Sequence, residues 1–594
     1  MNITKNLIIS QQYQLIILLL LALVLNMNTI FNGYTLDDDL VITKNSLVEK
    51  GIRGIPEILS TELFHGLKTE GPALSQARYR PFVLVIFAME YQFFGQNPIV
   101  SHLINVILFA LLIALLYKLL NNYVFRGQHQ YLAFFTCLLY TCHPVHCEVI
   151  ASVKSRDELI TYILLITSLI NILRCIEKPT ALKWIFAFIC FFTALLTRES
   201  AVTFIAVVPL ILYFFFNRSI KQSLLFTLPL FAITACYLVL RFSIIGPSHS
   251  TENINILNSP YLFASVSEAF ATKIFVLLKY LLLLLFPHPL SYEYGYNQIP
   301  YIELKSFQFI VSFIVLICLI VYALFAFKRK SLFSFCIMYF MLTISLVSNF
   351  VVDIGTPLSE RFLFQPSLAI CIIIAAIFIR AEKSYKVFSN GALLIIIFLF
   401  SIKTYNRNSV WKDSETLLLT DVISSPNSVR TNLYAGEMYI AKANTASNWE
   451  LIKENFKKAV YYEEKCITIF SNTPRAESDL VIAYSGLFNC YKSADLFFMD
   501  NNLDPSDPKV KKILNVLCNE YYKEGNGYYE NNNFDQAIEY YLKCLKIDSS
   551  RVEAWYTLGG IYFLKDDTAA GNRAWEKVKL LEPEHRYNKN EFSQ

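Results

Sequence analysis

Charged side chains are scarce in this chain. Only 17% of its 594 residues are Asp, Glu, Lys or Arg, whereas 55% are hydrophobic, and the mean hydropathy is +0.42. Soluble globular domains carry about 25% charged residues. A chain with so little charge cannot be soluble throughout, and much of it is expected to lie in lipid.

Three further absences narrow the possibilities. No glycine-rich loop that cradles nucleotide phosphates occurs, which argues against a soluble nucleotide as a group donor. The thirteen cysteines form no tandem Cys-x-x-Cys framework, and nine lie before Tyr405, mostly inside apolar runs, so they are expected to be small buried residues. No small-residue cleavage site follows Leu15–Leu25, so this run is expected to be the first membrane span.

Apolar runs near the ~20 residues that cross a bilayer recur from Leu15 to about Ile402. They predict an all-α, polytopic helix bundle of about eleven spans over residues 1–404. The predicted spans lie near residues 14–32, 100–120, 131–142, 158–173, 184–197, 201–216, 223–243, 306–327, 332–350, 362–379 and 391–404. Two other apolar stretches, Pro81–Phe94 and Thr272–Pro287, are predicted to be interfacial or re-entrant.

The distribution of charge predicts the orientation. Residues up to Thr404 carry a net charge of +9, and those from Tyr405 onward carry −4. The basic residues of the first part fall between spans, which favours a cytoplasmic N-terminus and not nucleic-acid binding. Loop 33–80, segment His143–Glu158, loops 246–271 and 288–305, and the whole tail are then non-cytoplasmic. A crossing by Thr272–Pro287 would put Lys328-Arg329-Lys330 on that side, which is why this stretch is excluded from the spans.

The tail, residues 405–594, predicts a soluble α-solenoid of tetratricopeptide repeats. Trp555-x-x-Leu558-Gly559-x-x-Tyr562 fits the start of such a repeat, and Pro583 lies where a repeat ends. One period of 34 residues earlier stand Tyr521, Gly525, Tyr528, Ala537 and Tyr541, and a more diverged unit runs from Asn432 through Gly436 and Tyr439 to Ala459. The glycines are expected to let paired helices approach closely. A repeat cannot bury its own apolar face, so the units must stack.

The first candidate site follows the first span, at Leu36-Asp37-Asp38-Asp39. A solvated loop is the plain interpretation. The functional alternative is a general base, or a pair of ligands for a divalent cation, at the surface where a lipid-linked substrate presents its head group. Successive residues cannot all point one way, so at most two of the three carboxylates should face a pocket. We expect Asp38 to be the base and Asp37 to orient it, with Asp39 a bystander.

The second candidate is Cys142-His143-Pro144-Val145-His146-Cys147-Glu148, which continues into Arg156-Asp157-Glu158. Cys-His-x-x-His-Cys suggests zinc in isolation. We prefer a polar active-site wall of His143, His146, Glu148, Arg156 and Glu158, completed by Glu360, without a metal. A structural helix end is the alternative.

Arginines mark the third group. Arg361, in Ser359-Glu360-Arg361-Phe362, is placed to hold a phosphate with its planar fork, unless Glu360 neutralises it as a structural pair. Arg198, beside Glu199 at another outer span end, carries the same two interpretations, and Arg78 and Arg80 add two more cations to the same face. Carboxylates on one wall and arginines on another suit a polyprenyl-phosphate donor. The arginines would hold the phosphate leaving group, and a carboxylate would take the proton from the attacking hydroxyl.

These motifs, in order, resemble the transmembrane and tetratricopeptide-repeat-containing protein O-mannosyltransferases, a family of the GT-C class of glycosyltransferases. The resemblance runs from about Asn32 to the end. Its motifs are Tyr34-Thr-Leu-Asp37-Asp38, Arg78-Tyr79-Arg80-Pro81, Ser101-His102-Leu-Ile-Asn105-Val106, His143-Pro144-Val-His146-Cys-Glu148, Arg156-Asp-Glu158-Leu, Arg198-Glu199, Phe286-Pro-His-Pro-Leu290-Ser291-Tyr292, Glu360-Arg361-Phe-Leu-Phe364-x-Pro366-Ser367 and Trp411-Lys-Asp-x-Glu415.

The resemblance implies inverting transfer of mannose from a polyprenyl-phosphate carrier to Ser or Thr hydroxyls of proteins. It implies Asp37 and Asp38 at the catalytic position and Arg361 near the carrier phosphate. Cys147 departs from the family's Thr, and the short repeat array is closer to relatives from Bacteroidota. We therefore expect a bacterial inner membrane with a periplasmic catalytic face and repeat domain, or the endoplasmic reticulum with a luminal one in a eukaryote.

Two other functions compete with this one. A non-catalytic membrane scaffold, whose repeats recruit partner proteins, does not need carboxylates and arginines that converge on one face. A flippase or transporter of lipid-linked sugars should show internal repeats of its spans, and none are apparent in the sequence.

Overall fold

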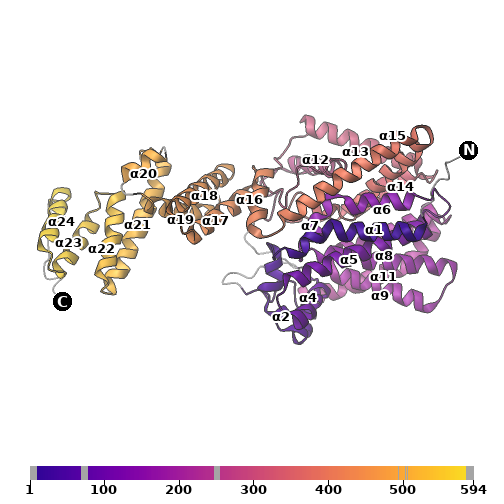
Figure 1. The fold of residues 1–594 in the computed structure, drawn as a ribbon, viewed down its shortest axis with the longest axis horizontal. Helices are drawn as coiled ribbons and strands as arrows, with labels where there is room; N and C mark the ends of the chain where they lie inside the picture. Colours follow the sequence, from indigo (N-terminus) through magenta and orange to yellow (C-terminus); the bar gives the residue numbers. More distant parts are fainter. Residues whose placement is uncertain are drawn as a thin grey trace, which may run out of the picture. The chain divides into compact units, whose positions relative to one another are not determined.

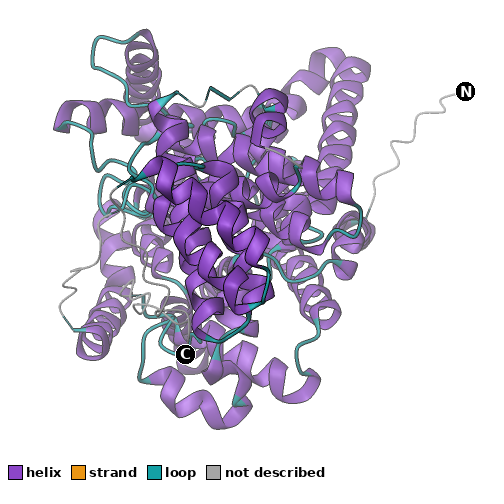
Figure 2. Cartoon of the chain, turned by 90° about the vertical axis from the view of Figure 1, so that its left-hand side faces the viewer, coloured by secondary structure: helices purple, strands orange, loops and turns teal. Residues whose placement is uncertain are grey.

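The computed structural model describes residues 10–68, 78–246, 255–491, 494–501, 503–504 and 506–583. Within these ranges the regular structure is helical, as predicted, with one isolated antiparallel bridge between Asn45 and Leu67 and no strand (Figure 2). Parts of the predicted loops 33–80 and 246–271, namely residues 69–77 and 247–254, lie outside the described residues.

The chain divides into two compact units, residues 1–431 and 432–594 (Figure 1). Residues 405–431, which the prediction assigned to the repeat domain, fold with the first unit. Arg407 and Asp421, buried there, form a two-pronged ion pair of 2.5 and 2.7 Å. Asp421 also accepts the backbone N–H of Tyr292 at 2.6 Å, which ties this segment to the loop before α13.

The helices of the first unit are α1 Gln11–Asn26, α2 Ser46–Glu49, α3 Ile55–Leu59, α4 Pro81–Phe94, α5 Pro98–Leu119, α6 Leu132–Cys142, α7 Cys147–Ala151, α8 Arg156–Glu177, α9 Ala181–Thr197, α10 Phe204–Phe215, α11 Ile220–Ile245, α12 Val266–Leu285, α13 Phe307–Phe327, α14 Leu332–Ser345, α15 Ser367–Val410 and α16 Ser414–Ser424. Polar caps begin several of them. Asn97 caps α5, and Ser219 with Gln222 forms a capping box at α11.

Apolar helices long enough to cross a bilayer are present among the described residues. They are Gln11–Phe31, Pro98–Val124, Arg156–Glu177, Ile220–Ile245 and Phe307–Phe327, and shorter apolar helices accompany them. The chain is a multi-pass membrane protein, and the count of about eleven spans stays a prediction.

The last two predicted spans, 362–379 and 391–404, belong to one helical element, α15. A straight helix would separate Ser367 from Thr404 by about 55 Å at 1.5 Å per residue. Ser367 Oγ nevertheless lies 2.8 Å from His146 Nε2, and Thr404 Oγ1 donates to Cys142 O at 2.8 Å. The two ends of α15 therefore lie close together, so the element doubles back on itself, as two antiparallel spans would.

Most of stretch Thr272–Pro287 lies in α12, which ends at Leu285, and three polar contacts of this helix go to segments predicted to be non-cytoplasmic. Thr272 Oγ1 accepts the N–H of Ile302 at 3.1 Å, and Tyr280 OH accepts the N–H of Ser359 at 3.1 Å. Near its end, Leu284 O lies 3.0 Å from His143 Nε2. A helix with such partners along its length supports an interfacial or re-entrant position.

Stretch Pro81–Phe94 is α4, and it packs on the first loop. Buried side chains of α4, among them Val83, Leu84 and Phe87, share a core with Val48 and Ile58 from that loop. This packing gives the first loop a rigid base.

Basic turns gather at the opposite end of the bundle. Arg126, after α5, pairs with Glu177 at the end of α8 at 2.8 Å, and Lys330, after α13, lies 3.4 Å from Asn217, after α10. The fold thus brings these predicted cytoplasmic turns to one end.

The second unit is built of helix pairs: α17 Val429–Thr445, α18 Trp449–Ile469, α19 Pro474–Asn489, α20 Ala494–Asp500, α21 Pro508–Glu530, α22 Phe534–Ile547, α23 Val552–Leu564 and α24 Thr568–Leu581. The predicted close approach at the glycines is present. A Cβ on Gly525 would lie 2.9 Å from the ring of Tyr541, and one on Gly559 would lie 2.3 Å from the ring of Trp575. The same glycine–ring contact thus recurs after 34 residues, which is the repeat period.

Candidate active site

The three consecutive aspartates point in three directions. Leu36 has a left-handed backbone with φ of 44°, and its N–H donates to Ser414 Oγ at 3.1 Å. A bulky residue adopts this conformation only when its surroundings impose it, and such strain gathers at functional sites. The resulting turn sends Asp38 inward and leaves Asp37 half-exposed, while Asp39 bonds Thr43 Oγ1 at 2.7 Å.

Asp38 is fully buried, and both of its oxygens are occupied. Oδ1 accepts the N–H of Lys154 at 2.7 Å and the hydroxyl of Ser152 at 3.3 Å. Oδ2 accepts the N–H and hydroxyl of Thr35 at 2.9 and 3.3 Å. Burial raises the pKa of Asp38 to about 6, against the effect of these donors. The group is placed to join the first loop to the segment after α7.

Asp37 has the surroundings of a reactive group. Its side chain is 47% exposed, and Oδ2 accepts from Lys154 Nζ at 3.0 Å. Lys154, followed by Arg361 and Arg78, holds the pKa of Asp37 well below its usual range, against the effect of burial. Burial lowers the pKa of Lys154, and Asp37 raises it. A half-exposed carboxylate therefore pairs with Lys154 and is influenced by the positive charges of Arg361 and Arg78.

Arg361 is anchored by Glu148 and not by Glu360. Nη1 donates to Glu148 Oε1 at 2.9 Å, and the Arg361 N–H donates to Glu148 Oε2 at 3.1 Å. Glu148 is buried, whereas the Arg361 side chain keeps 23% of its surface exposed. Glu148 thus holds both the backbone and one guanidinium nitrogen of Arg361, and the guanidinium keeps further N–H groups for a ligand.

Glu360 has other partners. Its Oε1 accepts the N–H of Ser291 at 2.5 Å and the hydroxyl of Tyr294 at 2.8 Å. Burial raises the pKa of Glu360 to about 8. The contact joins two of the motifs that carry the family resemblance, and its role is to hold the loop before α13 against the segment before α15.

Arg80 and Arg198 are engaged by buried carboxylates. Both donate to Asp157 Oδ2 at 2.8 Å. Arg80 also pairs with Glu199 at 2.8 Å, and Arg198 with Glu158 at 2.9 Å. Both arginines are less than a tenth exposed. Engaged in this network, the two guanidinium groups have little surface to offer a phosphate.

The remaining members of the predicted wall are also buried in the scaffold. Arg156 donates to Asn105 Oδ1 at 2.6 Å and to Ser101 O at 2.8 Å, and it pairs with Glu90. His143 Nε2 faces Leu284 O, and His146 Nε2 faces Ser367 Oγ. Burial lowers the pKa of His143 to about 4, so this imidazole is neutral.

A divalent cation shared by Asp37 and Asp38 does not fit this arrangement. Both Asp38 oxygens face N–H and O–H donors, and the neighbours of Asp37 are cations that would repel a metal ion. Among the described residues no three His, Cys, Asp or Glu side chains converge as ligands.

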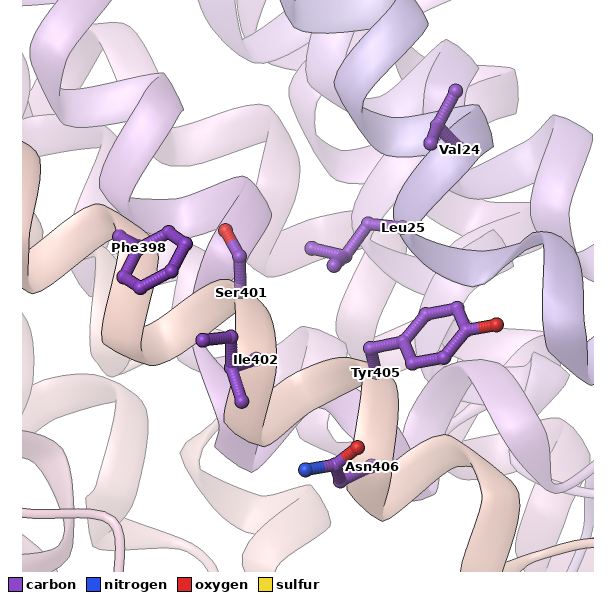
Figure 3. A pocket seen from close by; sticks show the side chains of 7 residues that line it. All are labelled: Val24, Leu25, Phe398, Ser401, Ile402, Tyr405 and Asn406. Atoms are coloured by element: carbon purple, nitrogen blue, oxygen red, sulfur yellow. The ribbon is translucent and has the colours of Figure 1, made fainter.

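An apolar groove of about 300 Å³ lies between α1 and α15 (Figure 3). Its lining is formed by Val24, Leu25, Phe398, Ser401, Ile402, Tyr405 and Asn406. Figure 3 shows the α15 side chains opposite those of α1. The segments that follow α1 and α15 meet beyond the groove, where the Gly33 N–H donates to Lys412 O at 2.8 Å. Gly33 lies shortly before the aspartate turn that begins at Leu36. The groove suits a hydrocarbon chain.

Lys154 was not among the site residues predicted from the sequence, and Arg78 was predicted only as an additional cation. Both cations were visible, in the polar segment before Arg156 and in Arg78-Tyr79-Arg80-Pro81. Their importance depends on the fold, because only the tertiary structure brings residues 37, 78, 154 and 361 together.

The comparisons with known proteins agree with the motifs. Residues 525–566 match the family model described as TPR repeat. The chain is 21% identical to "Protein O-mannosyl-transferase TMTC3" of Homo sapiens, over 94% of this chain and 67% of that protein. It is 24% identical to "Protein O-mannosyl-transferase TMTC1" of Homo sapiens, over 60% of this chain and 45% of that protein. It is 22% identical to "Protein O-mannosyl-transferase Tmtc3" of Drosophila melanogaster, over 83% and 60%.

The chain thus spans between about half and two thirds of the length of these relatives. The family resemblance predicted from the sequence is confirmed, and so is the presence of a tetratricopeptide repeat in the tail.

Proposed function

We propose that this homologue of the protein O-mannosyl-transferases moves mannose from a polyprenyl-phosphate carrier to Ser or Thr hydroxyls of proteins, with inversion at the sugar. The observation that carries the proposal is a half-exposed carboxylate, Asp37, that bonds Lys154 and lies in the electrostatic field of Arg361 and Arg78. Transfer of a sugar from a phosphate needs these two components at one place: cations for the leaving phosphate and a base for the hydroxyl.

The cations act on the phosphate. Arg361, fixed by Glu148, presents its free N–H groups, and Lys154 and Arg78 add positive charge beside it. As the bond between the anomeric carbon and the phosphate oxygen breaks, negative charge grows on that oxygen. Preorganised cations stabilise this charge without a reorganisation cost at the moment of reaction.

Asp37 acts on the acceptor. The Ser or Thr oxygen attacks the anomeric carbon from the face opposite the phosphate, and Asp37 takes the hydroxyl proton. The low pKa of Asp37 keeps it ionised and ready to accept. Donor phosphate would partly neutralise Lys154 and Arg361 and so raise the pKa of Asp37, which strengthens the base once the donor is bound. Displacement in one step inverts the sugar.

The assignment of the base departs from the sequence expectation of Asp38. Asp38 is fully buried, and four donors occupy its oxygens, so an acceptor hydroxyl has no route to it. We assign it the positioning of the first loop, and Arg80 and Arg198 the support of the site from behind.

The carrier and the acceptor are assigned to two further surfaces. The apolar groove between α1 and α15 suits the prenyl chain of a lipid carrier. The tetratricopeptide unit suits the recruitment of acceptor proteins. The charge distribution favours a site and repeats on the non-cytoplasmic side, in a bacterial inner membrane, or in the lumen of the endoplasmic reticulum in a eukaryote.

The test is transfer from synthetic polyprenyl-phosphate mannose to candidate acceptor proteins by the full chain in detergent. Acceptors come from intact glycoproteomics of the extracytoplasmic fraction, compared between the wild type and a deletion strain. The expected product carries mannose on Ser or Thr with the anomeric configuration opposite to that of the donor. Unchanged O-mannosylation in the deletion strain, together with no transfer in vitro, would favour a scaffold instead.

A further inference from the structure

The second unit contains a pair of cysteines that the proposed function does not use. Cys518 lies in α21 and Cys544 in α22, the two antiparallel helices of one repeat. Their Sγ atoms are 2.6 Å apart, and both side chains are buried. A disulfide bond has a length of about 2.05 Å, so the two sulfurs need to move by only about 0.6 Å to bond.

The surroundings favour the chemistry. Arg551 Nη1 lies 3.9 Å from Cys518 Sγ. The Cys544 side chain and the Arg551 guanidinium both lower the pKa of Cys518, and burial opposes them. The thiolate is the nucleophile in thiol–disulfide exchange, so a guanidinium beside one sulfur assists the first step.

We propose that Cys518 and Cys544 form a structural disulfide that joins α21 to α22. The Cys518 thiolate attacks the disulfide of a dithiol–disulfide oxidoreductase, and one thiol leaves the oxidant. The Cys544 thiolate then attacks the mixed disulfide and releases the second thiol. Two protein thiols lose two protons and two electrons, and the oxidant's disulfide becomes a dithiol.

The bond depends on the compartment. Disulfides persist in the periplasm or the lumen of the endoplasmic reticulum and are rare in the cytosol. The Cys518–Cys544 bond therefore forms if the repeats are extracytoplasmic, as proposed from the charge distribution. Its formation does not depend on glycosyl transfer. It would close a loop that includes the turn 531–533, and so reduce the freedom of the unfolded repeat.

The experiment is peptide mapping of the full chain, with cells lysed directly into N-ethylmaleimide. Trypsin cuts after Lys512, Lys523, Lys543 and Lys546, so the bond would link peptide 513–523 to peptide 544–546. The expected result is this linked peptide, lost after reduction. Recovery of both cysteines as maleimide adducts from unreduced protein would overturn the proposal.

A thermal assay gives a second measurement. Reductant should lower the Tm of the second unit in wild type by about 5–15 °C, and it should have no effect on Cys518→Ser. Cys490→Ser is the matched control, because Cys490 bonds the backbone of Gly486 at 3.3 Å and should leave the reductant effect intact. A wild-type Tm that is the same with and without reductant would also contradict the disulfide bond. If Cys518→Ser does not fold, the peptide map alone tests the proposal.

Discussion

Replacement of Asp37 by Asn should lower the activity and leave the stability almost unchanged, whereas replacement of Asp38 by Asn should lower the stability. Asp37→Asn keeps an amide oxygen for Lys154 Nζ and removes the base from a half-exposed position. We expect a stability cost of about 1 kcal/mol or less. Loss of a general base lowers the rate about 10²–10⁴-fold, which corresponds to ~2.7–5.4 kcal/mol in the barrier.

Asp38→Asn perturbs the fold instead. The new NH₂ group must face either the Thr35 pair of donors or the pair from Lys154 and Ser152. Each hydroxyl can rotate to accept from it, but one backbone N–H is left without an acceptor. A buried donor without a partner costs about 1–3 kcal/mol, so the Tm should fall by a few degrees.

The assay is transfer of mannose from a polyprenyl-phosphate donor in detergent, with Tm measured on the same preparations. Asp37→Asn should be folded and almost inactive, and Asp38→Asn should be less stable. Asp39→Asn is the matched control and should change little, because Asp39 bonds only Thr43 and Lys44 locally in the described part of the chain. Full activity in Asp37→Asn, with a stable but inactive Asp38→Asn, would refute the assignment of the base.

Three further outcomes are expected. Donor affinity is lost as pH rises through the pKa of Lys154, and Asp37 raises that pKa. Asp37→Asn should therefore move the alkaline limit of donor binding to lower pH, and an unchanged limit would show that the two groups are not coupled. Arg361→Lys should raise the donor KM about 10–100-fold with an unchanged Tm, because the planar fork is lost, and full affinity would contradict the phosphate role. Gly525→Ala should lower the Tm of the second unit by several degrees, since its Cβ would meet a tyrosine ring at 2.9 Å, whereas Gly527→Ala on the same helix has open space and should not.

The architecture was accessible from the sequence because it depends on local patterns. Apolar runs and basic turns indicate helices in a membrane, and the 34-residue spacing indicates paired helices. The contacts of Gly525 and Gly559 with aromatic rings one period apart show why that spacing is informative. The doubling back of α15 was also visible as two apolar runs, with basic residues between them.

The roles within the site were less accessible. The motif Leu36-Asp37-Asp38-Asp39 indicates a cluster of carboxylates, but the local sequence does not determine which of the three side chains faces the solvent. That choice follows from a left-handed residue at Leu36 and from the donors on the segment after α7. Arg80 and Arg361 look alike in the sequence. Asp157 and Glu199 pair with Arg80 and leave its side chain 10% exposed, whereas Arg361 pairs with Glu148 and stays 23% exposed.

The sequence by itself determined that this protein is a helical membrane bundle with a tetratricopeptide unit, and it indicated most of the polar residues that we assign to the site, though not Lys154. Only the tertiary structure decided which of them are accessible: Asp37 over Asp38, and Arg361 over Arg80 and Arg198. The physical reason is that hydropathy and periodicity are properties of neighbouring residues. The partner of a buried charge, in contrast, is supplied by segments distant along the chain, and that partner decides whether the charge supports the scaffold or remains free to act on a substrate.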